Sequence, residues 1–271
     1  MRKMMLTTRS RRVVELVRER PAAQAENRAG ARAKVVPHNP FHAVLNDGAW
    51  AGEPCFVIGG GPSLRGFDFE RLRGRGRVIA INRAYEFAPF ADMLFFMDNK
   101  FYKRCHEPRN IATWQAFQGY KVFLDLMGRT YDDCYHVRTM GRNGFSSSIA
   151  RGLYHGNNSG VGALGIALCL RARPIYLLGY DMRFDGKNSH FHDGYGPRPH
   201  EGVVRSFCRD FERMAKHIPD KRGIVNLNPR SMLRIFPFGN IDEVLGDGKT
   251  RQGVGDDGSA VRAPELLPAS A

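Results

Sequence analysis

The sequence lacks any run of apolar residues long enough to cross a bilayer, for which a helix needs about 20. No signal peptide is visible either, because no uninterrupted apolar stretch follows the basic N-terminus. The five cysteines are widely separated and form no Cys-x-x-Cys pair, so neither a disulfide framework nor a cysteine zinc site is indicated. These absences predict a cytoplasmic protein.

The 271 residues are 42% hydrophobic and 25% charged, which is typical of soluble globular proteins. This length accommodates one α/β domain of roughly 200 residues together with tails. We expect a basic, flexible arm over residues 1–34, with a short amphipathic helix in residues 1–20. A single domain follows over residues 35–245, and a disordered tail rich in Gly, Asp, Ala and Pro over residues 246–271.

The net charge of +14 is unevenly distributed. Residues 1–38 hold ten Lys or Arg against three Glu, and so contribute half of the net positive charge. Two interpretations of this arm stay open: a solvated tail, or weak electrostatic contact with RNA, DNA or anionic lipid. The remaining charge suits an enzyme with an anionic substrate. No zinc finger, RNA-binding aromatic signature or basic region with heptads is present.

Short apolar runs alternate with helical patterns, which predicts a doubly wound, mostly parallel, Rossmann-like α/β sheet. Several runs are continuous rather than alternating, as expected of strands buried on both faces. A helix is expected over residues 160–171 with Ser159 as its N-cap, and a second over residues 201–218, whose apolar stripe (Val203, Phe207, Phe211) is interpreted as core. The expected strands are Cys55–Ile58, Arg77–Ile81, Met93–Met97, Lys121–Leu124, Ile175–Leu178 and Ile224–Leu227.

The first strand runs directly into Gly59-Gly60-Gly61-Pro62-Ser63. Glycines permit positive φ and close approach of amide groups to an anion, so this turn is expected to cradle the phosphate of a nucleotide-type ligand. A P-loop is excluded because no Lys follows the glycines. A dinucleotide fingerprint is excluded because Leu64 and Asn82 stand where a small residue and an acid are required, and a serine-hydrolase elbow is absent.

Three blocks of sequence resemble the bacterial lipooligosaccharide sialyltransferases, glycosyltransferase family 42. The first is Phe56-Val-Ile-Gly-Gly-Gly-Pro-Ser-Leu followed by Val78-Ile-Ala-Ile-Asn-Arg. The second is Asn158-Ser-Gly-Val-Gly-Ala-Leu with Ile175-Tyr-Leu-Leu-Gly-Tyr-Asp, and the third combines Asn188-Ser-His-Phe-His with Asn228-Pro-Arg-Ser. The same blocks resemble a broader family that includes flagellin-modification proteins, archaeal hydroxymethylpterin diphosphokinases and phage-encoded proteins. The resemblance covers roughly residues 54–240.

The resemblance implies a set of site residues. Nucleotide binding falls to Gly59, Gly60, Gly61, Ser63, Asn82, Asp98, Asn158, Ser159, Gly160 and Asp181, and His192 or His190 is the implied general base. The sequence departs from the family at four points. Gly60 replaces an Asn, Gly156 and Asn157 stand where an Arg is usual, Arg183 stands at the position of a Tyr that assists the leaving phosphate, and the lid is shorter. These departures concern the sugar more than the nucleotide.

Three histidines, His190, His192 and His200, fall within eleven residues. A histidine suits the deprotonation of an acceptor hydroxyl near neutral pH, and Arg183, Lys187 or Tyr195 would meet the charge of the leaving phosphate. Two alternatives stay open. The His-x-His-Asp spacing also fits a metal site, with Asp181 and Asp185 near in sequence, or these residues simply decorate a polar loop.

The sequence therefore predicts a nucleotide-dependent transferase, foremost a sialyltransferase-like glycosyltransferase with a CMP-sugar or related donor and a glycan or other hydroxyl acceptor. It would need no cofactor. One alternative is a diphosphokinase acting with ATP on a pterin-type alcohol, which would require Mg²⁺ and acidic ligands such as Asp98, Asp181 and Asp185. Another is a non-enzymatic phage assembly or nucleic-acid-associated protein that uses the basic arm.

Overall fold

The computed structural model describes residues 39–186, 188–193 and 201–246, which belong to one compact unit. Its centre is a single sheet of eight strands in the order β6-β5-β4-β3-β2-β1-β7-β8, and every neighbouring pair is parallel. The predicted α/β fold with a parallel sheet is confirmed. The expected helix in residues 1–20 and the tail beyond residue 246 lie outside the described residues.

All six expected strands are present. They are β1 (Cys55–Ile58), β2 (Arg77–Ile81), β3 (Met93–Phe96), β4 (Tyr120–Asp125), β7 (Ile175–Leu178) and β8 (Ile224–Asn226). Two more were missed, β5 (Tyr135–Gly141) and β6 (Leu153–Tyr154). β5 carries polar residues such as Arg138 and Thr139 and is only partly buried, and β6 has two residues, so neither forms a continuous apolar run.

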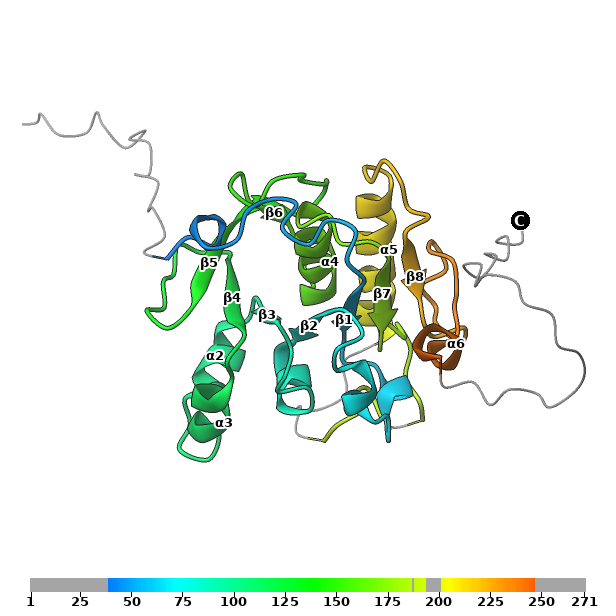
Figure 1. Cartoon of the computed structure of the whole chain (residues 1–271), viewed down its shortest axis with the longest axis horizontal. Coiled ribbons are helices and arrows are strands. Elements are labelled where there is room, and N and C mark those ends of the chain that lie inside the picture. The colour runs from blue at the N-terminus through cyan, green and yellow to red at the C-terminus, as the bar shows by residue number, and fades with distance from the viewer. Residues whose placement is uncertain (1–38, 187, 194–200, 247–271) are drawn as a thin grey trace, which may run out of the picture. The chain divides into compact units, whose positions relative to one another are not determined.

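The core has two layers, one on each face of the sheet. Successive strand residues alternate between them, with Val57 facing one layer and Phe56 the other. The first layer includes α4 (Ser159–Cys169) and α5 (Glu201–Ala215). The second lies under α2 (Asn99–Cys105), α3 (Ile111–Ala116), α6 (Ile241–Leu245) and four-to-five-residue 3-10 turns such as η3 (Phe69–Leu72) and η4 (Asn82–Glu86). In Figure 1, α4 and α5 lie on the opposite side of the strands from α2 and α3.

Helix α4 is apolar all round and is buried between the sheet and its neighbours. A Cβ on Gly162 would come within 2.7 Å of the Phe95 ring, so glycine allows the helix to pack directly on β3. The expected N-cap was wrong by one residue. Asn158, rather than Ser159, caps the helix, because its Oδ1 accepts a 2.9 Å hydrogen bond from the amide of Val161. None of the helices in the described ranges is both long enough and apolar enough to span a membrane.

Candidate functional site

A cavity of about 570 Å³ opens at the carboxyl ends of the central strands. It is bordered by the residues that follow β1, β2, β3, β4 and β7, and by the first residues of α4. The chain leaves β1 toward β2 and later returns to β7 on the opposite side of β1. Such a reversal in strand order creates a crevice outside the strand ends, and this is where parallel α/β sheets bind ligands.

The glycine turn forms one wall of this cavity, but its amides are mostly engaged within the protein. Gly59 donates to the carbonyl of Leu178 and Gly61 to that of Gly179, both at 2.8 Å. The amide of Ser63 donates to the carboxylate of Asp181 at 2.9 Å. The expectation of positive φ was also wrong, since none of the three glycines is in the left-handed region. The turn therefore binds the loop after β7 rather than presenting a full set of amides to a phosphate.

Close approach explains why glycine is needed at these positions. A Cβ on Gly61 would lie 1.9 Å from Oδ2 of Asp181, and one on Gly59 would lie 2.8 Å from the carbonyl oxygen of Gly179. A Cβ on Gly60 would instead meet the ring of His190 at 2.8 Å. Two of the glycines therefore make room for the loop after β7, and the third makes room for a histidine of the cavity.

Asp181 is the central link between the two loops. Besides the amide of Ser63, its carboxylate accepts a 2.7 Å hydrogen bond from the Ser63 hydroxyl. Burial raises the pKa of Asp181, and the two hydrogen bonds from Ser63 oppose that effect. Asp181 borders the cavity, yet both of its oxygens already have partners. Its role in the described structure is to fix the turn.

Asn82 begins the 3-10 turn η4 directly after β2 and has a φ of +49°. Its Oδ1 is buried without a hydrogen-bond partner among the described residues. Of the four non-glycine residues with positive φ in the described ranges, Asn82, Asn157 and Met182 border the cavity. Unfavourable backbone conformations and unsatisfied polar atoms concentrate at functional sites, so this pattern marks the cavity as one.

Asp98, two residues after β3, and Asp125, the last residue of β4, also border the cavity. Asp98 caps α2, accepting a hydrogen bond from the amide of Lys100 at 2.7 Å. The carboxylate of Asp125 accepts hydrogen bonds from the amides of Met127, Gly128 and Arg129, and so shapes the loop that overhangs the cavity. Both carboxylates are therefore held in place at the border of the cavity.

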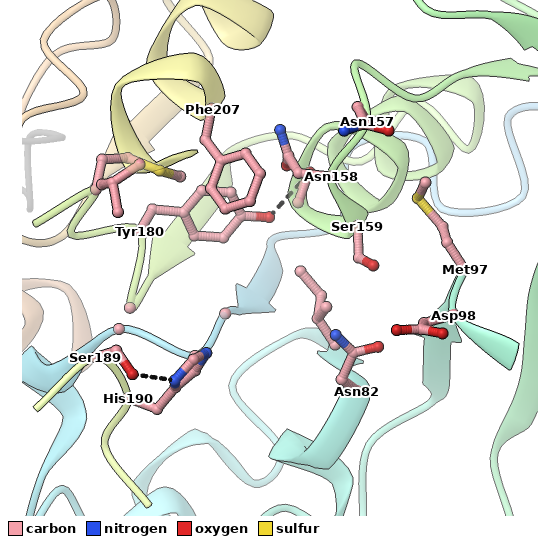
Figure 2. A pocket seen from close by; sticks show the side chains of 18 of the residues that line it. Asn82, Met97, Asp98, Asn157, Asn158, Ser159, Tyr180, Ser189, His190 and Phe207 are labelled. Carbon is pink, nitrogen blue, oxygen red and sulfur yellow. Dashed lines mark hydrogen bonds between the residues drawn. The ribbon is translucent and has the colours of Figure 1, made fainter. Parts of the chain in front are cut away.

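Asn158, Ser159 and Gly160 bring the amino end of α4 to the cavity. Figure 2 shows Asn158 and Ser159 at the start of this helix, with Asn82 and Asp98 across the open space. The first turn of α4 contains no acidic side chain. Amide groups at the start of a helix lack partners within the helix and carry a partial positive charge, so they attract phosphate or carbonyl oxygens.

His190 borders the cavity, and its Nδ1 lies 2.8 Å from the hydroxyl oxygen of Ser189 (Figure 2). Burial lowers the pKa of His190, and the positive charge of Arg83 lowers it further. The imidazole is therefore neutral at physiological pH. When Nδ1 donates its proton to Ser189, Nε2 becomes the acceptor that a general base requires.

His192 does not border the cavity. Its ring stacks on Phe87 at a centroid distance of 5.7 Å, and its Nδ1 lies 3.2 Å from Nη1 of Arg83. Burial and Arg83 lower the pKa of His192 to about 4. The structure thus separates the two candidate bases and places only His190 at the cavity. The third histidine, His200, lies outside the described residues, as do Lys187 and Tyr195.

The remaining charged candidates occupy different places. Arg183 borders the cavity with an exposed side chain, and its Nη1 donates to the carbonyl of Arg230 at 3.4 Å. Asp185 does not border the cavity and instead pairs its backbone with Asn188 in a short bridge. Within the described ranges, no three His, Cys, Asp or Glu side chains gather as a metal site would require.

Sequence reasoning missed the apolar part of the cavity wall. Tyr180 borders it and donates its hydroxyl to the carbonyl of Gly160 at 3.2 Å. Phe207 was assigned to the core stripe of its helix, but it faces the cavity from α5, as Figure 2 shows, whereas Phe211 is buried in the core. Met97 completes this wall from the end of β3. The position of Tyr180 directly after a buried strand, between Gly179 and Asp181, was the one signal that could have placed it at the cavity.

No protein-family model matches the chain, and no curated protein matches it significantly. Among solved structures, the chain is similar to the sialyltransferase CstII from Campylobacter jejuni, determined in complex with a substrate analogue, cytidine-5'-monophosphate. The two chains share 14% sequence identity and superpose with a TM-score of 0.43. The match covers 81% of this chain and 95% of that chain.

Proposed function

We propose that this protein is a nucleotide-dependent transferase, specifically a sialyltransferase-like glycosyltransferase that uses a CMP-sugar or a related donor. One observation carries the proposal. A single cavity at the reversal point of the sheet gathers Asn82 with its unsatisfied oxygen, the amino end of α4 and the half-buried His190. These residues come from distant stretches of sequence, and they supply an acceptor, amide donors and a base within one space.

The nucleotide would lie between the amino end of α4 and the turn after β2. Amides of Ser159 and Gly160 offer donors to its oxygen atoms, and the helix dipole favours an electron-rich group there. Oδ1 of Asn82 offers a buried acceptor for a hydroxyl of the ribose or sugar. Tyr180 and Phe207 provide aromatic surface for a planar base. A volume of about 570 Å³ lies within the range of small-molecule sites.

His190 is the general base of the proposed reaction. Its Nε2 removes the proton from the acceptor hydroxyl while that oxygen attacks the anomeric carbon of the donor sugar. The bond between this carbon and the phosphate oxygen breaks, and the nucleotide leaves with the electron pair. Arg183 borders the same cavity and would offset the charge that develops on the departing phosphate. The Ser189 hydroxyl orients the imidazole and can accept the proton of Nδ1, which leaves Nε2 as the acceptor.

Isothermal titration calorimetry with CMP, UDP, GDP and ATP, each with and without Mg²⁺, tests the proposal. We expect CMP to bind without Mg²⁺ and the others to bind more weakly. A matched donor should then lose its sugar to a hydroxyl acceptor in an assay of released CMP. Binding of ATP alone, and only with Mg²⁺, would instead support the phosphotransferase alternative. Absence of binding by all four nucleotides would exclude nucleotide-dependent transfer.

A further inference from the structure

Arg83 connects the turn after β2, which borders the cavity, to the segment that carries His190, residues 188–193. It follows Asn82 in η4, and its side chain is only 11% exposed. The guanidinium forms a two-pronged ion pair with Glu86, with Nε–Oε1 and Nη2–Oε2 distances of 2.8 and 2.6 Å. The remaining nitrogen, Nη1, reaches Nδ1 of His192 and donates to the carbonyl of Asp193. Glu86 thereby fixes the orientation of the Arg83 guanidinium, and the guanidinium holds His192 and Asp193 in place.

The same segment is anchored at two further points. Phe191 is buried against the rings of Phe69 and Phe87, with centroid distances of 5.3 and 4.9 Å. Its amide donates to the carbonyl of Gly60 at 3.1 Å. Phe191 therefore ties the segment to the glycine turn, but it constrains only the middle of the segment. The rings of His190 and His192 stack on one another at 5.7 Å, so the position of one limits that of the other.

We propose that Arg83 is a positioning residue for His190: by holding His192 and the carbonyl of Asp193, it fixes the ring against which the His190 imidazole packs. The proposal rests on the proposed function, because it assigns His190 the role of base. Arg83 does not border the cavity, so its variants should affect the geometry and protonation of the base without removing a ligand contact. Asn82, its neighbour in sequence, does border the cavity, so its variants would remove a ligand contact.

The charges around His190 also bear on its protonation. Among the described residues they include Arg83 and Glu86 of η4, Arg65 directly after η2 (Pro62–Leu64), and His192 and Asp193 of its own segment. Arg65 donates to the carbonyl of His190 at 3.5 Å and lies 3.9 Å from the Asp193 carboxylate. Burial lowers the pKa of His190 first, and Arg83 lowers it further. Loss of Arg83 should therefore raise this pKa and leave more of the base protonated near neutral pH.

The test compares Arg83→Gln and Arg83→Lys with a matched control, Arg73→Gln. Arg73 forms an equivalent pair with Glu70 three residues away, with Nε–Oε2 at 2.6 Å, but it lies on the exposed surface. NMR titration of the His190 imidazole, assigned from a His190→Ala spectrum, gives its pKa directly. Transfer rates across the pH range and CMP calorimetry complete the set, and thermal melts check that each variant is folded.

We expect Arg83→Gln to raise the pKa of His190 toward the ordinary value of about 6.5 and to move the acidic limb of the rate profile upward. Turnover should fall by about 10- to 100-fold through misplacement of the base, while CMP affinity is retained. Arg83→Lys keeps the charge but not the fork, so the His190 pKa should stay low while turnover recovers only partly. Arg73→Gln should match the wild type in every measurement.

Two results would overturn the proposal. One is an unchanged His190 titration and rate profile in folded Arg83→Gln protein, and the other is an equal loss in Arg73→Gln. If Arg83→Gln does not fold, Arg83→Lys decides the question, because full activity with the fork removed contradicts positioning. Failure of the proposed function would look different. Wild-type protein would then bind no nucleotide, whereas the NMR titration would still report whether Arg83 controls the protonation of His190.

Discussion

Oδ1 and Oδ2 of Asp181 accept hydrogen bonds from the amide and hydroxyl of Ser63, at 2.9 and 2.7 Å, across 118 residues of sequence. This pair joins the turn after β1 to the turn after β7, on the two sides of the reversal point where the cavity opens. The carboxylate accepts hydrogen bonds from both donors of Ser63, a residue that the sequence assigned to nucleotide binding. The geometry of the glycine turn is therefore set within the protein.

Two replacements of Asp181 distinguish the contribution of its hydrogen bonds from that of its charge. Asp181→Ala should lower the free energy of unfolding by about 1–2 kcal/mol, because it removes the acceptor of two hydrogen bonds, from the amide and the hydroxyl of Ser63. Asp181→Asn should cost much less, since an amide can accept from the Ser63 amide and donate to its hydroxyl. Urea denaturation of the three proteins measures the difference. Equal losses in both variants would contradict the role of the hydrogen bonds.

The difference in stability between wild type and Asp181→Asn should depend on pH. The folded state raises the pKa of Asp181, so it holds the proton more tightly than the unfolded chain does. Ionisation of Asp181 therefore costs stability, and this cost grows as the pH rises from about 3.9 through the folded pKa. Asp181→Asn lacks this cost. We expect its stability relative to wild type to improve between about pH 4 and pH 7, as measured by urea denaturation at each pH.

Two neighbouring glycines should respond differently to an added methyl group. In Gly61→Ala the Cβ would overlap Oδ2 of Asp181, which is held in place, so we expect a loss of about 1–3 kcal/mol or more in the free energy of unfolding. In Gly60→Ala the Cβ meets the ring of His190, a side chain that can rotate away. Its stability should be nearly unchanged while transfer activity falls. Chemical denaturation and the transfer assay distinguish the two cases.

Asn82 offers a test of nucleotide recognition that leaves the backbone intact. Asn82→Gly preserves the left-handed conformation and removes the buried oxygen, so CMP affinity should fall by about 10-fold, the equivalent of one hydrogen bond of about 1.4 kcal/mol. Asn82→Ala should lose the same affinity and also destabilise the fold by about 1 kcal/mol, because alanine disfavours positive φ. Calorimetry and denaturation together give both values. Unchanged affinity in Asn82→Gly would remove this residue from the site.

Local patterns predicted the elements of the fold well, and long-range geometry accounts for the failures. Continuous apolar runs located six strands, and the stripe containing Phe211 located α5. The same periodicity could not show that Phe207 faces a cavity rather than the core, because one helical face serves both. The hydrogen bond between Ser63 and Asp181 could not be predicted either, because the two residues are 118 positions apart and no local pattern links them. The sequence identified the turn, but the fold determined what the turn binds.

The sequence placed His192 first as the general base and His190 second, whereas only His190 borders the cavity. They are separated by Phe191, whose burial anchors the segment and leaves His190 at the cavity and His192 against Phe87 and Arg83. His190→Ala should therefore reduce turnover by about 10²–10⁴-fold while CMP binding persists. The acidic limb of the rate profile, expected below about pH 6.5 because the pKa of His190 is lowered, should disappear with it.

His192→Ala serves as the matched variant two residues away. It removes a ring that packs on His190 but leaves the proposed base in place, so its turnover should fall far less and its acidic limb should remain. Stopped assays from about pH 5 to pH 8 with both variants provide the comparison. A larger defect in His192→Ala than in His190→Ala would reverse the assignment, because a residue outside the cavity would then control the chemistry more strongly than the one that borders it.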